Sequence, residues 1–119
     1  MSVYDTANRL ARELKRSEEY KAYFEIKEKI EENSKTKEML LDFQREQFKL
    51  QSKAFSGQEV TEEEKKKLNS LSEIIKLNND IQKYLDTEYR MSVMLNDIQK
   101  ILFADLEIGF RDEEEEKHP

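Results

Sequence analysis

Glu88 is the residue of this sequence best placed for special chemistry, because it lies in the middle of an apolar stripe. The stripe belongs to a segment predicted to be helical, and its members are Ile81, Tyr84, Leu85, Met91, Leu95, Ile98 and Leu102. A carboxylate there must be paired, hydrogen-bonded or left at a solvent gap, because unpaired burial raises a carboxyl pKa. Glu88 is therefore either a functional acid or a single polar group that fixes helix register or oligomer state. We favour the polar specificity role.

Other side chains that commonly carry out chemistry are scarce. The chain has no Cys and one His, His118, which lies in the acidic C-terminal segment. These counts argue against thiolate metal sites, Cys nucleophiles and His-based catalysis. With Gly57 and Gly109 as the only glycines, neither a phosphate-binding loop nor a dinucleotide fingerprint can form. We therefore expect no enzyme activity, no cofactor and no tightly bound transition metal. An all-carboxylate metal or acid/base site is the alternative.

Composition indicates that long helices carry these residues. Charged residues make up 40% of the 119 residues and hydrophobic residues 36%, against roughly 25% and 45–50% in an average soluble domain. Long helices with solvated outer faces accommodate so much charge when they share a core between chains. The content of 2 Gly and 1 Pro also disfavours strands and tight turns. We predict an all-α helical bundle of about five helices, with a long C-terminal helix, that forms an oligomer.

The helix boundaries follow from local signals. The first helix is predicted over about 3–15, and the third over about 35–56. Ser17, Asn33-Ser34, the Thr61–Glu64 capping box and Asn78–Asp80 are the predicted caps between helices, and Gly57 is predicted to end the third. The fifth helix is predicted over about 81–108, with Gly109 after it.

The predicted third helix has an unusually wide apolar face. Leu41, Phe48 and Phe55, seven residues apart each time, form one shoulder. The other shoulder consists of Met39, Phe43, Leu50 and Ala54, and between the two lie Leu40, Gln44, Gln47 and Gln51. The arc of about 200° exceeds the stripe that docks a helix on one neighbour. We therefore expect this helix to contact two partners. The Leu41/Phe48/Phe55 shoulder is the predicted oligomer interface, and the glutamines form a polar seam.

The remaining features bound the domain organisation and the partners. Residues 1–110 are predicted to form a single helical domain, and 111–119 a disordered acidic tail, because like charges repel there and nothing apolar anchors them. The start of the chain lacks the regions of a signal peptide, and no apolar run is long enough to span a bilayer. We expect a cytoplasmic protein. Its formal charge of −6 argues against nucleic acid and anionic membranes as partners.

The order of these features resembles the YheA branch of the YlbF/YmcA family of small bacterial all-helical proteins. The segments that carry the resemblance are Ser17–Tyr20, Phe43-Gln44, Leu50-Gln51, Gly57–Glu64, Ile81–Leu85 and Glu88–Ser92. The resemblance covers nearly everything up to Ile108, and the acidic tail lies outside it.

The resemblance implies an all-helical, self-associating cytoplasmic protein with bacterial regulatory work. Relatives of the YlbF and YmcA type are linked to competence, sporulation and biofilm formation, and act in a complex that influences ribonuclease Y and messenger RNA processing. Those relatives are also associated with cysteine-ligated iron–sulfur clusters. This chain has no Cys, so the resemblance implies no such cluster here.

These observations lead to one functional hypothesis and two alternatives. We expect a non-enzymatic regulatory or adaptor protein that acts as a homo-oligomer, with a dimer favoured, and through contacts with other proteins. The first alternative is a purely structural homo-oligomer. The second is a small-molecule binder centred on Glu88, which a buried cavity beside that residue would favour.

Overall fold

The computed structural model describes residues 2–109, and within this range it contains five helices and no strand. The helices are α1 (Val3–Arg16), α2 (Glu18–Glu31), α3 (Ser34–Phe55), α4 (Glu62–Lys76) and α5 (Asn79–Phe103). The predicted all-α class and the long C-terminal helix are confirmed.

Each predicted N-cap is confirmed by a hydrogen bond. In each case a side-chain oxygen accepts from the backbone N–H three residues later, which satisfies one of the free donors at the helix start. These caps are Ser17 for α2, Asn33 for α3, Thr61 for α4 and Asn78 for α5. Short polar side chains thus set every junction between consecutive helices, with connections of only a few residues except between α3 and α4.

Gly57 ends α3 as predicted. Its φ is +79°, in the left-handed region that favours glycine. The N–H of Gln58 donates to the carbonyl of Lys53 at 2.8 Å, and the N–H of Gly57 donates to the carbonyl of Ala54 at 3.3 Å. These two bonds form a Schellman motif, from which the chain turns back towards α4.

The predicted end of α5 at Ile108 was wrong, because the helix ends at Phe103. The N–H of Leu106 donates to the carbonyl of Phe103 at 3.2 Å, which closes a turn beyond the helix. Phe103 is 53% exposed and Ile108 is 79% exposed, so this end of the chain packs little against its own fold. Helical stability comes mostly from such packing. The sequence pattern predicted a longer helix because it does not show where this packing stops.

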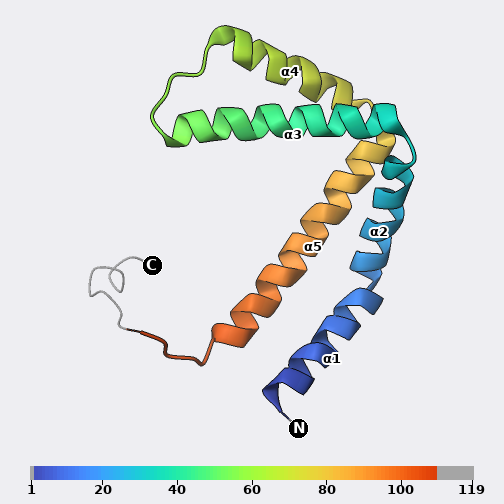
Figure 1. The fold of residues 1–119 in the computed structure, drawn as a ribbon, viewed down its shortest axis with the longest axis vertical. Helices are drawn as coiled ribbons and strands as arrows, with labels where there is room; N and C mark the ends of the chain where they lie inside the picture. Colours follow the sequence, from blue (N-terminus) through green and yellow to red (C-terminus); the bar gives the residue numbers. More distant parts are fainter. Residues whose placement is uncertain (1, 110–119) are drawn as a thin grey trace.

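The five helices form two arms that meet at one end (Figure 1). In one arm α3 and α4 lie antiparallel, and in the other α2 lies antiparallel beside α5, with α1 continuing from α2. The radius of gyration is 19.4 Å, against about 13.5 Å for a compact domain of this length. Taken as a single chain, the protein is therefore open and does not close into one bundle.

The hydrophobic core lies where the two arms meet. It joins residues of α2, α3, α4 and α5, namely Ile26, Ile30, Leu40, Ile75 and Ile81. Ile81 has no exposed surface at all. α1, in contrast, has no buried residue. The arms therefore extend away from a small core with much of their apolar surface uncovered.

Candidate protein-contact surface

α3 exposes the Leu41/Phe48/Phe55 shoulder. Phe48 is 72% exposed and Phe55 is 97% exposed, while Leu41 is half-buried. Two large aromatic side chains in solvent, on one side of one helix, are unusual for an isolated protein and mark a contact surface. The assignment of this shoulder to an oligomer interface stays a prediction, since the structure contains one chain.

The opposite shoulder of α3 packs inside the chain. Leu50 is buried, Met39 and Phe43 are half-buried, and only Ala54 of that set is exposed. α3 contacts both α4 and α2 within the chain, while the expectation that its other shoulder meets a different partner stays a prediction. At about 100° per residue, Leu50 and Phe48 point nearly 160° apart on the helix. Packing against α4 therefore leaves the Phe48 side free.

The glutamines between the shoulders are not covered equally. Gln44 is half-buried near the core, whereas Gln47 and Gln51 are exposed. In the outer half of α3 the expected polar seam therefore lies open beside Phe48 and Phe55. A surface of aromatic and amide side chains offers both apolar area and hydrogen bonds to a partner.

Glu88 is exposed in the single chain. It lies beside Tyr84, which is paired with Tyr23. The hydroxyl oxygens of Tyr23 and Tyr84 lie 3.4 Å apart, with ring centroids separated by 5.5 Å. Burial raises the pKa of Tyr84, and the Tyr23 hydroxyl and the Glu88 carboxylate beside it raise that pKa further. Tyr84 therefore remains a neutral hydrogen-bonding group at any physiological pH.

Two hollows along this part of α5 are small. One, lined in part by Tyr84, Gln44 and Leu41, has a volume of about 80 Å³, and the other, lined in part by Thr87 and Arg90, about 250 Å³. Ligand pockets usually measure roughly 300–1,000 Å³. Neither hollow includes Glu88 in its lining, so neither favours the small-molecule alternative.

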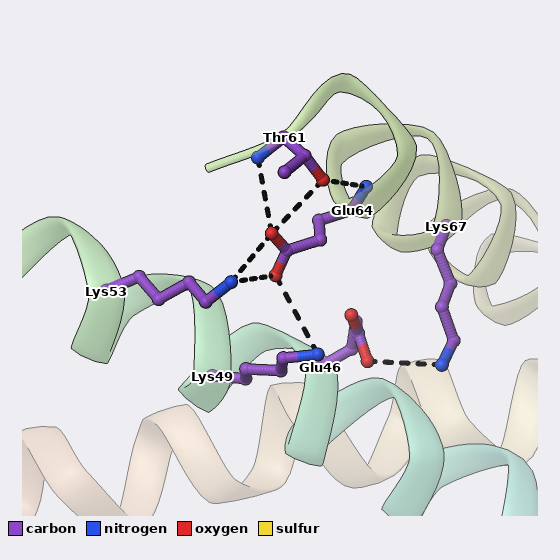
Figure 2. A network of polar contacts seen from close by, with 6 residues as sticks. All are labelled: Glu46, Lys49, Lys53, Thr61, Glu64 and Lys67. Atoms are coloured by element: carbon purple, nitrogen blue, oxygen red, sulfur yellow. Dashed lines mark hydrogen bonds and ion pairs between the residues drawn. The ribbon is translucent and has the colours of Figure 1, made fainter. Parts of the chain in front are cut away.

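A network of charged side chains fastens α4 to α3 (Figure 2). The Lys53 ammonium donates to both oxygens of Glu64 at 2.8 Å, and Lys49 lies 3.7 Å from the same carboxylate. Thr61 donates to Glu64 through its backbone N–H and its hydroxyl, at 3.2 and 3.1 Å. The Lys53 hydrogen bond and the Thr61 N–H lower the pKa of Glu64 from 4.5 to about 2.

Glu46 and Lys67 form the second contact of this network. Glu46 is buried, with 6% of its surface exposed, and its carboxylate lies 3.4 Å from the Lys67 ammonium (Figure 2). The sequence analysis did not identify Glu46. Its signal was present, because Glu46 follows Phe43 by three residues and precedes Leu50 by four, which places it on the same packed side of α3.

These carboxylates hold α3 and α4 together through ion pairs. Both Glu46 and Glu64 face ammonium groups, which neutralise them. Within residues 2–109 no group of three or more acidic, His or Cys side chains is arranged to hold a metal ion. Over the same range no helix is both long and apolar enough to cross a membrane. The network instead stiffens the hairpin that carries the exposed aromatics.

The fold and its polar contacts define an open, all-helical protein. Its ion pairs fasten α4 to α3, and the exposed apolar shoulder of α3 suits contact with another helix. The chain belongs to the YlbF/YmcA family. Its residues 3–107 match the family described as "Control of competence regulator ComK, YlbF/YmcA". This confirms the resemblance seen in the sequence, and the YheA branch is consistent with it.

Relatives and a solved structure agree with this membership. A UPF0342 protein of Halothermothrix orenii is 56% identical, over 96% of this chain and 97% of its own length. A UPF0342 protein of Caldicellulosiruptor bescii is 43% identical, over 94% and 92%. A protein of unknown function (DUF964) from Bacillus stearothermophilus has the same fold, with a TM-score of 0.72 at 17% identity, over 86% of this chain and 90% of that one.

Proposed function

We propose that this protein is a non-enzymatic regulator or adaptor that acts through self-association, as a homodimer, and through contacts with other proteins. The observation that carries the proposal is the pair of solvent-exposed phenylalanines, Phe48 and Phe55, on the stiffened α3–α4 arm. The family description, control of a competence regulator, supports a regulatory role, and the pathway we propose for it is bacterial development or RNA processing. A cytoplasmic location fits such a role.

The α3 shoulder is suited to contact with a helix. Leu41, Phe48 and Phe55 recur every seven residues, the spacing that keeps a seam against one neighbouring helix. Aromatic side chains are enriched at the energetic centres of protein interfaces. Lys53, which pairs with Glu64 of α4 and fastens the arm, lies on the other side of α3. The shoulder is therefore held on a stiff support without its own residues being used to build that support.

Phe48→Glu tests the shoulder as a subunit contact. A carboxylate in an apolar interface is strongly unfavourable, so the variant is expected to stay helical by circular dichroism and to sediment as a smaller species in analytical ultracentrifugation. Leu77→Glu is the matched control, since Leu77 is 86% exposed and lies outside the shoulder. A helical Phe48→Glu variant of unchanged mass would contradict the assignment.

Phe55→Glu tests the same shoulder at a position that does not pack within the chain. If Phe48→Glu unfolds outright, its effect on the chain's own packing cannot be separated from its effect on an interface. Phe55 is 97% exposed, so a charge there disturbs no packing within the chain. Loss of mass in Phe55→Glu with retained helicity supports the subunit contact, and retained mass in Phe55→Glu opposes it.

Affinity purification from the native cell separates an adaptor from a purely structural oligomer. The wild-type protein is expected to recover a defined protein partner, identified by mass spectrometry, that the Leu77→Glu control also recovers. Recovery of the chain alone, from wild type and control alike, would favour the structural alternative.

A further inference from the structure

α5 carries a second set of apolar positions that its own chain covers on one side only. From Tyr84 to Leu102 the stripe follows alternating steps of four and three residues, the spacing of a helix-to-helix seam. Tyr84, Met91 and Ile98 form one row and are half-buried. Glu88, Leu95 and Leu102 form the adjacent row and are exposed, Leu95 by 47% and Leu102 by 54%.

The charges of this segment lie away from both rows. Apart from Glu88, the charged residues between Tyr84 and Leu102 are Asp86, Arg90, Asp97 and Lys100. In the heptad frame set by the two rows, all four occupy positions on the outer side of the helix. The positions that flank the seam are uncharged, as in a helix that packs against more than one neighbour. Apart from Glu88, the exposed row therefore has the composition of a surface that another helix could cover.

α1 has the same pattern with even less cover. Val3, Ala7, Leu10 and Leu14 also follow steps of four, three and four residues. Val3 is 83% exposed, and α1 has no buried residue. α1 and the C-terminal half of α5 extend from the core to the same end of the molecule (Figure 1), and α1 packs within the chain mainly against α2.

We propose that a second copy of this chain covers these two seams, here called the α1–α5 face, so that α1 and α5 of both copies form a four-helix bundle. The inference rests on the self-association proposed above and assigns it a surface. Two helices of each copy with the same seam spacing are complementary to themselves under two-fold symmetry. Antiparallel four-helix bundles are assembled from such seams with small crossing angles.

The open chain exposes more surface than a compact monomer of the same mass. The accessible surface of the chain is 10362 Å², whereas a compact monomer of this size exposes about 6,800 Å². A stable dimer needs only about 800 Å² from each partner. The open chain as a whole therefore exposes more surface than a dimer must bury, and the α1–α5 face is part of that surface.

Leu95→Glu and Leu102→Glu test the proposal on the full chain. Each puts a charge in the exposed row, so the mass by analytical ultracentrifugation is expected to fall by half while helicity is largely kept. Val93→Glu is the matched control, because Val93 is 41% exposed on the same helix but lies outside the seam. Its mass is expected to equal that of wild type.

The variants separate this inference from the proposed function. When the Leu95 and Leu102 variants halve the mass, the Phe48→Glu variant shows whether the α3 shoulder also takes part. If Phe48→Glu halves the mass as well, both surfaces belong to one dimer interface; if it does not, the α1–α5 face alone joins the copies. Either result supports the inference. Loss of mass with Phe48→Glu but not with the Leu95 and Leu102 variants overturns it and leaves self-association intact. A wild-type protein that is monomeric at all concentrations overturns both.

Hydrogen exchange of the wild-type protein gives a second test that needs no variant. Because α1 has no buried residue in the single chain, its own helical hydrogen bonds give its amides little protection there, and cover by another chain would slow their exchange further. We expect these amides to exchange at least about tenfold more slowly in the assembled protein than after dilution below the dissociation constant. Equal, fast exchange of α1 in both samples overturns the proposal, even if the Glu variants fail to fold.

Discussion

Glu64 illustrates how one side chain can be fixed by both local and distant contacts. Thr61, three residues earlier, supplies the capping contact, and Lys53 supplies the contact from α3. The capping box was predictable because both of its members are close in sequence. The Lys53 contact was not, because it depends on the turn after Gly57 that brings α4 back along α3.

Replacement of Glu64 by Gln should change how stability depends on pH. The folded-state pKa of Glu64 is about 2, against 4.5 unperturbed. A carboxylate with a lowered pKa contributes stability in full above about 4.5, and this contribution is lost as pH falls towards 2. We expect the urea midpoint of Glu64→Gln to lie below that of wild type at pH 6 and the two to converge near pH 2.

The matched control for this measurement is Glu63→Gln, which changes an exposed neighbour in the first turn of α4. It carries the same loss of charge at the helix N-terminus, so the difference between the two variants reports the contacts of Glu64 with Lys53, Lys49 and Thr61. A gap between wild type and Glu64→Gln that stays constant from pH 6 to pH 2 would show that Glu64 is not ionically paired.

Glu88→Leu tests the polar specificity role of that residue. Glu88 heads the exposed row of α5, at a position where an apolar residue would fit a helix-to-helix seam. A single polar residue there fixes register at a cost in stability. We expect the leucine variant to be more stable by about 1–3 kcal/mol per chain, with a broader distribution of masses. Lys83→Leu, on the exposed opposite side of α5, is the control, and a destabilised Glu88→Leu would indicate a paired or functional acid instead.

At the scale of whole elements, local signals were enough to place most of the helices. Ser17, Asn33, Thr61 and Asn78 all act as predicted caps, because capping depends on a few adjacent residues. The end of α5 could not be placed in the same way, since no strong breaker precedes Gly109 and tertiary packing decides how far the helix continues. The division of α3 into a packed and an exposed shoulder followed from periodicity, but which shoulder packs did not.

Thr61→Ala tests how much the cap of α4 contributes. The Thr61 hydroxyl accepts from the N–H of Glu64 at 3.1 Å, and the loss of such a cap typically costs about 1 kcal/mol. We expect the free energy of unfolding, measured in urea, to fall by that amount. Thr6→Ala, a hydroxyl within exposed α1, is the control. A loss no larger than that of the control would mean that the Lys53–Glu64 and Glu46–Lys67 contacts hold α4 without the cap.

At the scale of the molecule, the predicted tail over 111–119 lies outside the described residues, and so does the limit of the predicted domain at 110. Truncation after Phe110 tests both. With a run of acids and no apolar residue after Phe110, the tail cannot bury enough surface to offset the entropy of ordering it. We expect the thermal midpoint and the helical circular-dichroism signal to stay nearly unchanged, and a drop of many degrees would reveal a docked segment.

The thermal midpoint of the wild-type protein should itself depend on protein concentration. Within residues 2–109 of the single chain only six hydrophobic residues are buried, and both arms extend beyond the core. Folding and association are then coupled, since a second copy supplies burial that one chain lacks. A tenfold rise in concentration adds about 1.4 kcal/mol per mole of dimer, which corresponds to a rise of about 3 °C for a dimer of this size. Differential scanning calorimetry over a hundredfold range of concentration measures this shift, and an invariant midpoint would show that the open chain is stable alone.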